Sequence, residues 1–360
     1  MNPDVNPALV PASTFDSQDI EVGIWFRNFA SLFQFEEISH YLTALSKLRV
    51  TLVGESIVDK YTSVNPLSKT SKDPILAFHL GETKTFFGGI LAIASNVCHW
   101  VDYVQVISCC KTGDEYRFVP SNSVNMSMKL VQTASPTITK HRYIDKGTNS
   151  KVFETYDFDP TFFQEDFLIE NTSISSVDFS KADVTIIADY GHGLMTPELI
   201  GLATNNSNFL CVNVQSNAGN RGFNTFDKYP KFNFFTANSG ELQIQSRQSH
   251  PDFGSIMKQI INDKNAKMGI MTEGRQGLTV FTPNRQHSAM ALASQVIDKV
   301  GAGDSVLAIS SLLAYLDTPI EVIAFISNLV AAREVRTQGH QNPISIDELK
   351  RVIKEAYARL

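Results

Sequence analysis

Cysteine is scarce in this chain, and its few copies form no recognisable binding pattern. The sequence contains four cysteines in 360 residues, and no two of them are spaced as a CxxC pair. Cys109 and Cys110 are adjacent, which suits neither a disulfide framework nor a zinc site. We therefore predict reduced thiols that form part of the interior.

Long apolar runs and an excess of basic charge are also absent. No stretch approaches the roughly 18 consecutive apolar residues of a membrane span, and the N-terminus lacks the basic start and apolar segment of a secretory signal. Lysine and arginine total 31 against 37 acidic residues, a net charge of −6, whereas binding to a phosphate backbone needs a basic surface. We therefore expect no membrane or nucleic-acid partner and a cytoplasmic location.

Hydrophobic residues are plentiful, at 43% of the sequence, so the chain can bury a sizeable core. Its 360 residues fit one large α/β domain with an appendage best. Residues 1–20 are rich in proline, asparagine, aspartate and serine, which predicts a poorly ordered arm. Apolar residues recur at helical spacing over 38–48, which predicts a lead-in helix. We therefore divide the chain into residues 1–48 and a main domain over 49–360.

From residue 49 onward, β-type runs alternate with helical stretches, which predicts parallel βαβ units in a doubly wound α/β sheet. The expected strands are 50–53, 104–107, 184–188, 209–214, 233–236 and 268–271. The expected helices lie near 90–100, 196–204, 252–263, 303–316, 319–335 and 345–359. Two segments, 58–87 and 124–157, interrupt this rhythm with short alternating strands, and we expect them to pair as a small β-lid over one edge of the site.

The strongest chemical signal lies within residues 298–305, where Gly301-Ala302-Gly303-Asp304 opens a helical pattern. Small residues at a helix start let backbone amides approach a ligand, and those amides and the helix dipole favour a phosphate. Asp304 lies inside this anion-binding turn, where it suits a general base that takes a proton from a hydroxyl. The alternative is a tight turn with Asp304 as an N-cap. No Walker-type P-loop motif occurs, which excludes that route to phosphate binding.

At this motif the chain resembles the ribokinase-like (PfkB) carbohydrate kinases, whose signature is an aspartate, a short spacer and Gly-Ala-Gly-Asp. The resemblance runs from about Arg49 to the end, with several motifs in the family order. It implies a mostly parallel sheet flanked by helices, with a small β-lid. It also implies ATP and Mg²⁺ as cofactors, a monovalent cation as a further candidate, and a small-molecule sugar or sugar phosphate as the substrate.

The resemblance assigns the sugar side of the site. Gly88-Gly89 matches a glycine pair that lets the sugar approach the backbone, and Asp59 matches an aspartate that holds sugar hydroxyls. Taken alone, the glycines could be a plain helix-start turn and the aspartate a solvated loop residue. The family usually has an asparagine where Ala92 stands, and Asn96, one helical turn later, is a candidate replacement.

The resemblance also assigns the nucleotide side. Asn238 and Glu241 match an Asn-x-x-Glu motif that organises Mg²⁺ and its waters, although the same spacing also makes a capping box. A Thr-x-Gly-x-x-Gly stretch matches a turn that borders the nucleotide in the family; taken alone, it could be an ordinary hairpin turn. An asparagine on a predicted helix fits a family position near adenine. The residues expected to bind the nucleotide are Thr272, Gly274, Gly277 and Asn328.

Within the family, the closest likeness is to heptose-phosphate kinases, the kinase half of bifunctional kinase–nucleotidyltransferases. Residues 136–142 resemble their lid segment, in which Lys140 and Arg142 would meet a substrate phosphate. An edge strand kept soluble by charge is the alternative. Residues 188–193 resemble their Ser-Asp-Tyr-x-x-Gly turn and place Asp189 at the carboxyl end of a strand, where ligands gather in open sheets.

Several positions depart from the family pattern. Glu55 stands where an aspartate is more usual, Gln215 ends a stretch that replaces Asp-Pro-Lys, and Lys299 replaces a threonine. These departures bear on the substrate more than on the reaction, because the Gly-Ala-Gly-Asp turn is intact.

The sequence therefore predicts ATP-dependent phosphorylation of a hydroxyl on a sugar or sugar phosphate. Two alternatives stay open: a non-catalytic homologue that binds sugar or nucleotide, and a kinase of a nucleoside or vitamin alcohol. The exposed strand edges of the lid also predict a homodimer, since two lids can cover each other's edges.

Overall fold

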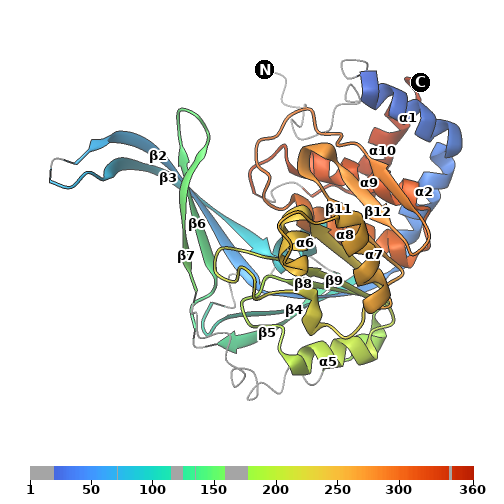
Figure 1. Cartoon of the computed structure of the whole chain (residues 1–360), viewed down its shortest axis with the longest axis horizontal. Helices are drawn as coiled ribbons and strands as arrows, with labels where there is room; N and C mark the ends of the chain where they lie inside the picture. Colours follow the sequence, from blue (N-terminus) through green and yellow to red (C-terminus); the bar gives the residue numbers. More distant parts are fainter. Residues whose placement is uncertain (1–19, 71, 115–124, 134, 159–176, 340–342) are drawn as a thin grey trace.

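The structure, a computed structural model, describes residues 20–70, 72–114, 125–133, 135–158, 177–339 and 343–360. These residues form a large α/β body and a smaller β-sheet that projects from it (Figure 1). The arm predicted over residues 1–20 lies outside the described residues, apart from the last of them.

The body is built on a nine-stranded sheet that is mostly parallel. Its strands, in spatial order, are β13 (Gln286–Ala289), β12 (Leu278–Phe281), β11 (Met268–Thr272), β10 (Phe234–Asn238), β9 (Leu210–Val214), β8 (Val184–Asp189), β1 (Arg49–Gly54), β4 (Tyr103–Lys111) and β5 (Met126–Thr133). The β11–β12 and β12–β13 pairs are antiparallel, and every other neighbouring pair in this sheet is parallel. All six strands predicted from the sequence are present in this sheet, so the doubly wound α/β prediction is confirmed.

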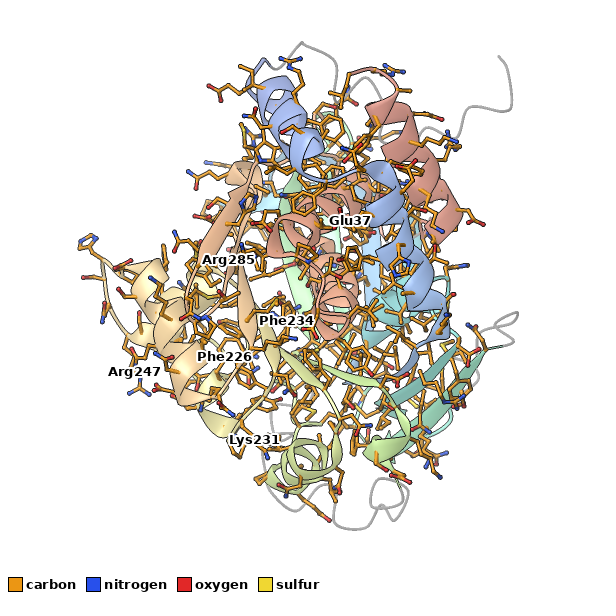
Figure 2. The ribbon with its side chains drawn as sticks, turned by 90° about the vertical axis from the view of Figure 1, so that its right-hand side faces the viewer. Glu37, Phe226, Lys231, Phe234, Arg247 and Arg285 are labelled. Carbon is orange, nitrogen blue, oxygen red and sulfur yellow. The ribbon has the colours of Figure 1, made fainter. Side chains whose placement is uncertain are left out.

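Helices cover both faces of this sheet, and each face has its own apolar core. One core joins α1 (Ile20–Leu32), α2 (Phe35–Ala44), α3 (Ile90–Val97), α8 (Ala302–Tyr315), α9 (Ile320–Glu334) and α10 (Ile346–Tyr357). The other joins α5 (Pro197–Asn206), α6 (Ser239–Ser246) and α7 (Phe253–Asp263). Figure 2 shows the side chains between the layers, with Phe226 and Phe234 inside and Arg247 at the outer edge.

The lead-in segment is part of the body's core. The helix predicted over 38–48 ends earlier in the structure than expected. It is α2, which ends at Ala44 and is followed by a 3₁₀ turn, Leu45–Lys47. A further helix, α1, precedes it, and its Phe29 ring lies 4.6 Å from that of Phe325 in α9. The Tyr357 hydroxyl of α10 donates to the carbonyl oxygen of Phe33 at 2.6 Å. These contacts tie the segment before β1 to the last two helices.

The projecting sheet contains four strands in the order β3-β2-β6-β7, and we call it the lid. Its strands are β2 (Ser56–Lys69), β3 (Leu76–Gly89), β6 (Thr139–Asp145) and β7 (Lys151–Asp157). The strands β2 and β3 form a long hairpin that extends away from the body (Figure 1). The lid therefore combines the two segments that interrupt the βα alternation.

The lid prediction over 124–157 is wrong at its start, because β5 belongs to the main sheet, where it pairs with β4. The residues of β5 alternate between the two faces: Met128 packs against one core and Val131 lies in the other. A period of two predicts a strand but does not say which sheet it joins. Residues 124 and 134 lie outside the described residues.

The parallel strands place polar residues at one edge of the main sheet. The carboxyl ends of β8, β9, β10 and β11 meet there, and the lid strands start beside them because β2 follows β1 after a single residue. This is the edge at which open α/β sheets bind ligands. No helix among the described residues is long and apolar enough to cross a membrane.

Candidate active site

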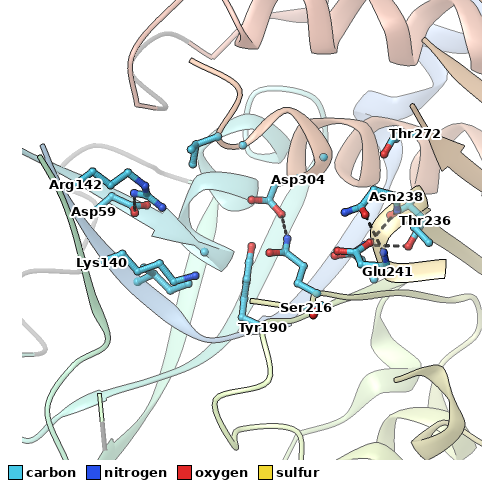
Figure 3. A pocket seen from close by; sticks show the side chains of 18 residues that line it. Asp59, Lys140, Arg142, Tyr190, Ser216, Thr236, Asn238, Glu241, Thr272 and Asp304 are labelled. Atoms are coloured by element: carbon cyan, nitrogen blue, oxygen red, sulfur yellow. Dashed lines mark hydrogen bonds and ion pairs between the residues drawn. The ribbon is translucent and has the colours of Figure 1, made fainter. Parts of the chain in front are cut away.

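A pocket lies at this edge, between the carboxyl ends of the strands, the lid and the N-terminus of α8 (Figure 3). The lid contributes Asp59, Lys140 and Arg142, and the opposite wall carries Asn238 and Glu241. Ten residues expected in the site line this pocket: Asp59, Gly89, Lys140, Arg142, Asn238, Glu241, Thr272, Gly301, Gly303 and Asp304.

The N-terminus of α8 faces the pocket with its backbone amides uncapped. Gly301 is the N-cap residue, in the left-handed region with φ 88°, and no side chain caps the helix. A Cβ on Gly303 would meet nothing within 4 Å, so the space above this turn is open. Unsatisfied amides at a helix start, in an open space, suit an anion.

Asp304 lies at the centre of the pocket, between the lid residues and the Asn238–Glu241 wall (Figure 3). It is the third residue of α8, so the alternative of an N-cap aspartate is wrong. Gln215 donates a hydrogen bond from Nε2 to its Oδ1 at 2.7 Å. A carboxylate beside an anion-binding helix start is placed to accept a proton from a hydroxyl in the pocket.

On the lid side, Asp59 and Arg142 form a buried ion pair, and each side chain is 8% exposed. Arg142 also contacts Glu154, with Nε 3.4 Å from Oε2. Gly88 makes room for the pair, because a Cβ there would overlap the Asp59 carboxylate. The solvated-aspartate alternative is therefore wrong, and Gly88 acts on the site through Asp59.

Lys140 is a second buried cation of the lid, at 8% exposure. Its ammonium lies 5.7 Å from the ring centre of Tyr156 and 5.9 Å from that of Tyr190. Burial lowers its pKa, and the neighbouring acidic groups oppose that effect. It makes no ion pair within the described part of the chain. The edge-strand alternative is wrong, since β6 lies between β2 and β7.

On the opposite side, Asn238 and Glu241 form a reciprocal capping box at the start of α6. The Asn238 amide donates to Glu241 Oε2 at 2.8 Å, and the Glu241 amide donates to Asn238 Oδ1 at 2.9 Å. Both residues also line the pocket, so the cap and the site coincide. Burial raises the pKa of Glu241 to about 7, because its carboxylate has little water around it.

This donor set fits Mg²⁺ held partly through water and phosphate oxygens. The described residues contain no group of three or more acidic, histidine or cysteine side chains that could cage a metal. Mg²⁺ is usually held by one or two carboxylates and keeps several waters. A half-buried carboxylate such as Glu241, facing the pocket, is stabilised by a nearby cation.

Two residues expected to bind the substrate point elsewhere. The side chain of Asp189 accepts hydrogen bonds from Tyr229 and Asn224 and lies 2.5 Å from the Lys228 ammonium, in a buried network behind the pocket wall. The Asn96 amide reaches back within its own helix to the carbonyl of Ala92, at 3.5 Å. Neither residue lines the pocket, so both site assignments are corrected.

The predicted nucleotide residues are only partly brought together. Thr272 lines the pocket, whereas Gly274 and Gly277 shape the turn between β11 and β12, both with positive φ. A Cβ on Gly277 would overlap the backbone of β13. Asn328 is buried and donates to the carbonyl of Ala289 at 3.1 Å. It holds β13 in place and does not line the pocket. Ala302 is also not among the lining residues, although it lies between two that are.

Three residues that the sequence reasoning did not assign to the site shape its floor. Tyr190 lines the pocket next to Asp304 (Figure 3). Gln215 also lines the pocket and donates a hydrogen bond to Asp304. Glu55 is fully buried below them and accepts backbone hydrogen bonds from the turn that carries Tyr190. The available signal was departure from the family pattern, since Glu55 and Gln215 are two of the positions that differ.

Comparison with curated proteins finds relatives that are named as bifunctional proteins. The bifunctional protein HldE of Shewanella baltica (strain OS185) is 24% identical over 289 residues, which cover 77% of this chain and 58% of the relative. HldE of Desulfatibacillum aliphaticivorans is 23% identical over 310 residues, 83% of this chain and 62% of the relative. The chain thus spans less than two thirds of the length of these relatives.

Solved structures share the fold at low sequence identity. A ribokinase from Thermotoga maritima superposes with a TM-score of 0.62 at 15% identity, covering 85% of this chain and 99% of the ribokinase. Phosphofructokinase-2 from Escherichia coli, in complex with fructose-6-phosphate, superposes with a TM-score of 0.62 at 13% identity. The superposition covers 87% of this chain and 100% of the phosphofructokinase. These similarities show a ribokinase-like fold.

The family model described as pfkB family carbohydrate kinase matches residues 103–347. This range includes β6 of the lid, the strand ends at the pocket and the α8 turn with Asp304. Because the match covers more than half of the chain, the protein belongs to the pfkB family of carbohydrate kinases.

Proposed function

We propose that this chain transfers the γ-phosphoryl group of ATP to a hydroxyl of a sugar phosphate. The observation that carries the proposal is the position of Asp304, beside the uncapped start of α8 and between two chemically different walls. One wall offers Asp59, Arg142 and Lys140 to an acceptor. The other offers Glu241 and Asn238, which suit the metal-bound phosphates.

In this proposal, Asp304 takes the proton of the acceptor hydroxyl while the hydroxyl oxygen attacks the γ-phosphorus, and the bond from that phosphorus to the bridging oxygen breaks to release ADP. The amides of Gly301, Ala302 and Gly303 stabilise the negative charge that the transferring group carries, as oriented backbone dipoles do in phosphoryl transfer. Mg²⁺, held by Glu241 with Asn238 orienting its waters, would supply the charge that neutralises the polyphosphate.

The lid residues favour an acceptor that already carries a phosphate. Arg142 is committed to Asp59 and Glu154, whereas Lys140 makes no ion pair among the described residues. Its buried ammonium therefore has charge to offer to an anionic group of the substrate. A charge-assisted hydrogen bond of this kind contributes roughly 1.5–3 kcal/mol.

An ADP-release screen over hexose, heptose and pentose phosphates beside the free sugars tests this proposal. We expect turnover on a sugar phosphate, and we expect Lys140→Met to raise its KM by roughly 10- to 100-fold while the KM for ATP changes little. Lys146→Met, at an exposed lysine of the lid, is the matched control. Equal KM values for wild type and Lys140→Met would contradict the role of this lysine.

A homodimer formed through the lid is a further part of the proposal. Large apolar side chains are exposed on the lid and on the turn of its long hairpin, and a second lid could cover them. They are Leu67, Ile75, Leu76, Leu80, Phe87, Val152 and Phe153. Analytical ultracentrifugation should give a dimer, and Leu80→Glu should shift it to monomer. A monomeric wild type at micromolar concentration would contradict this.

A monovalent cation is a candidate cofactor, since phosphofructokinase-2 of Escherichia coli has been solved in complex with potassium. We expect turnover in potassium chloride to exceed turnover in tetramethylammonium chloride at equal ionic strength. Equal rates in the two salts would count against it.

A further inference from the structure

The main chain of Tyr190 is held by more polar side chains than a turn needs. Glu55, which is fully buried, accepts a hydrogen bond from the backbone amide of Tyr190 through Oε2, at 3.1 Å. The backbone carbonyl oxygen of Tyr190 accepts two hydrogen bonds from side-chain amides, one from Asn217 at 2.7 Å and one from Asn220 at 2.8 Å. These groups come from the end of β1 and from the loop after β9. Buried polar groups that all serve one residue indicate that its position matters.

The side chain held in this way points at Asp304 (Figure 3). Tyr190 is 2% exposed, and its ring lines the pocket floor. Burial raises the pKa of its phenol well above the usual value, and the charge of Asp304 is the next cause. The phenol therefore stays protonated. Its hydroxyl makes no hydrogen bond within the described residues, so its O–H is a free donor that faces the carboxylate.

Gln215 approaches the same carboxylate from the end of β9 and is anchored in the same way. Its Nε2 donates to Asp304 Oδ1 at 2.7 Å. Its own amide donates to the Asp189 carbonyl at 2.9 Å, and its carbonyl accepts the Asn224 side chain at 3.1 Å. Loop 217–224 therefore fixes both donors next to Asp304.

We infer that Tyr190 and Gln215 are positioning residues that hold the Asp304 carboxylate in the orientation needed to take the acceptor's proton. A carboxylate at the start of a helix can rotate about its last side-chain bond. The Gln215 hydrogen bond restricts that rotation, and the Tyr190 hydroxyl, which pairs with no described residue, offers a second donor. Misplacement of a reacting group by about 1 Å can cost a factor of 10² in rate. This inference rests on the proposed function, because it assigns a task to the same base.

The test compares variants that remove one donor and little else. Tyr190→Phe keeps the ring below Lys140, and Gln215→Met keeps the length of the side chain. For each we expect kcat to fall roughly 10- to 100-fold, with the KM for ATP and for the acceptor within about twofold of wild type. Gln215→Lys restores a donor and should recover most of kcat. Tyr103→Phe removes a phenol that bonds Ser127 instead, and should keep wild-type kcat.

Two results would overturn the inference. The first is a wild-type kcat in both Tyr190→Phe and Gln215→Met. The second is a raised KM for the acceptor with an unchanged kcat, since that result would mean that these side chains bind the substrate. Melting temperatures and Mg-ATP binding by calorimetry confirm that each variant is folded. If Asp304→Asn itself keeps wild-type turnover, the proposed function fails. If Asp304→Asn is inactive while the donor variants are fully active, only this inference fails.

Discussion

Glu55 is a single residue whose burial has consequences for both the site and the stability of the fold. Its carboxylate has no exposure and accepts the amides of Tyr190 at 3.1 Å and His192 at 3.0 Å. Burial, followed by the charge of Asp189, raises its pKa from 4.5 to about 7, against the opposing effect of these hydrogen bonds. Glu55 therefore holds the turn that carries Tyr190, below Asp304, while its own carboxyl group is costly to ionise.

The raised pKa of Glu55 predicts a pH-dependent stability. A carboxyl whose pKa is higher in the folded than in the unfolded state binds more protons when folded, so its contribution decreases as the pH rises from about 4.5 to 7. Urea unfolding at intervals across this range should show a smaller loss of unfolding free energy in Glu55→Gln than in wild type. Glu36→Gln, at an exposed glutamate, is the control. Identical pH slopes in wild type and Glu55→Gln would refute the prediction.

Gly88 gives a prediction at the sugar side. A methyl group there would overlap the Asp59 carboxylate and displace it from Arg142. We expect Gly88→Ala to raise the KM for the acceptor at least about tenfold, because the pair loses its geometry. Gly201→Ala, where a Cβ meets nothing within 4 Å, should leave the KM unchanged and stabilise α5 by up to about 1 kcal/mol. An unchanged KM in Gly88→Ala would show that the pair tolerates the displacement.

At the scale of elements, one carboxylate links the lid to the turn before α8. Asp298, 5% exposed, accepts the Tyr61 hydroxyl of β2 at 2.8 Å and the Lys151 ammonium of β7 at 2.9 Å. Its Oδ1 also accepts the amide of Val300 at 3.1 Å, next to Gly301. Two lid strands and the turn before α8 therefore meet at one side chain.

Removing one of these contacts should loosen the lid. We expect Lys151→Met to speed hydrogen exchange in β6 and β7 and to raise the KM for the acceptor several-fold, because the lid residues reach the pocket through those strands. Lys84→Met, at an exposed lysine of β3, should change neither. Unaltered exchange in Lys151→Met would show that Asp298 does not hold the lid.

The sequence predicts elements better than it predicts the directions of single side chains. Alternation of βα units identified the parallel strands, because buried parallel strands and amphipathic helices have different periods. It did not separate β5 from the lid, since an edge strand of either sheet alternates in the same way. It also missed α1, whose apolar residues pack on helices nearly 300 residues later.

The site shows the same limit. The motif 298–305 and the lid cations were predicted, because small residues and charges mark them in the sequence. Asp189 was misassigned because successive side chains near a strand end alternate in direction. Tyr190 faces the pocket, and its predecessor faces the buried network. Which of two neighbours reaches a pocket depends on packing that no local pattern records.

At the scale of the whole molecule, a chain of net charge −6 must attract a polyanionic nucleotide. The structure supports a local solution. The start of α8 presents uncapped amides, Lys140 supplies a buried cation, and the Asp59–Arg142 pair is internally neutral. Metal-bound phosphates would bring compensating charge to Glu241. Attraction that depends on a few groups in a pocket needs no basic surface.

The central claim is that Asp304 is the base of a sugar phosphate kinase. Its most direct test is ADP release by Asp304→Asn, with Mg-ATP and the best acceptor from the screen. We predict that kcat falls by roughly 10²- to 10⁴-fold, the usual contribution of a general base, while calorimetry shows Mg-ATP still bound. Turnover of Asp304→Asn within a few-fold of wild type would contradict the account.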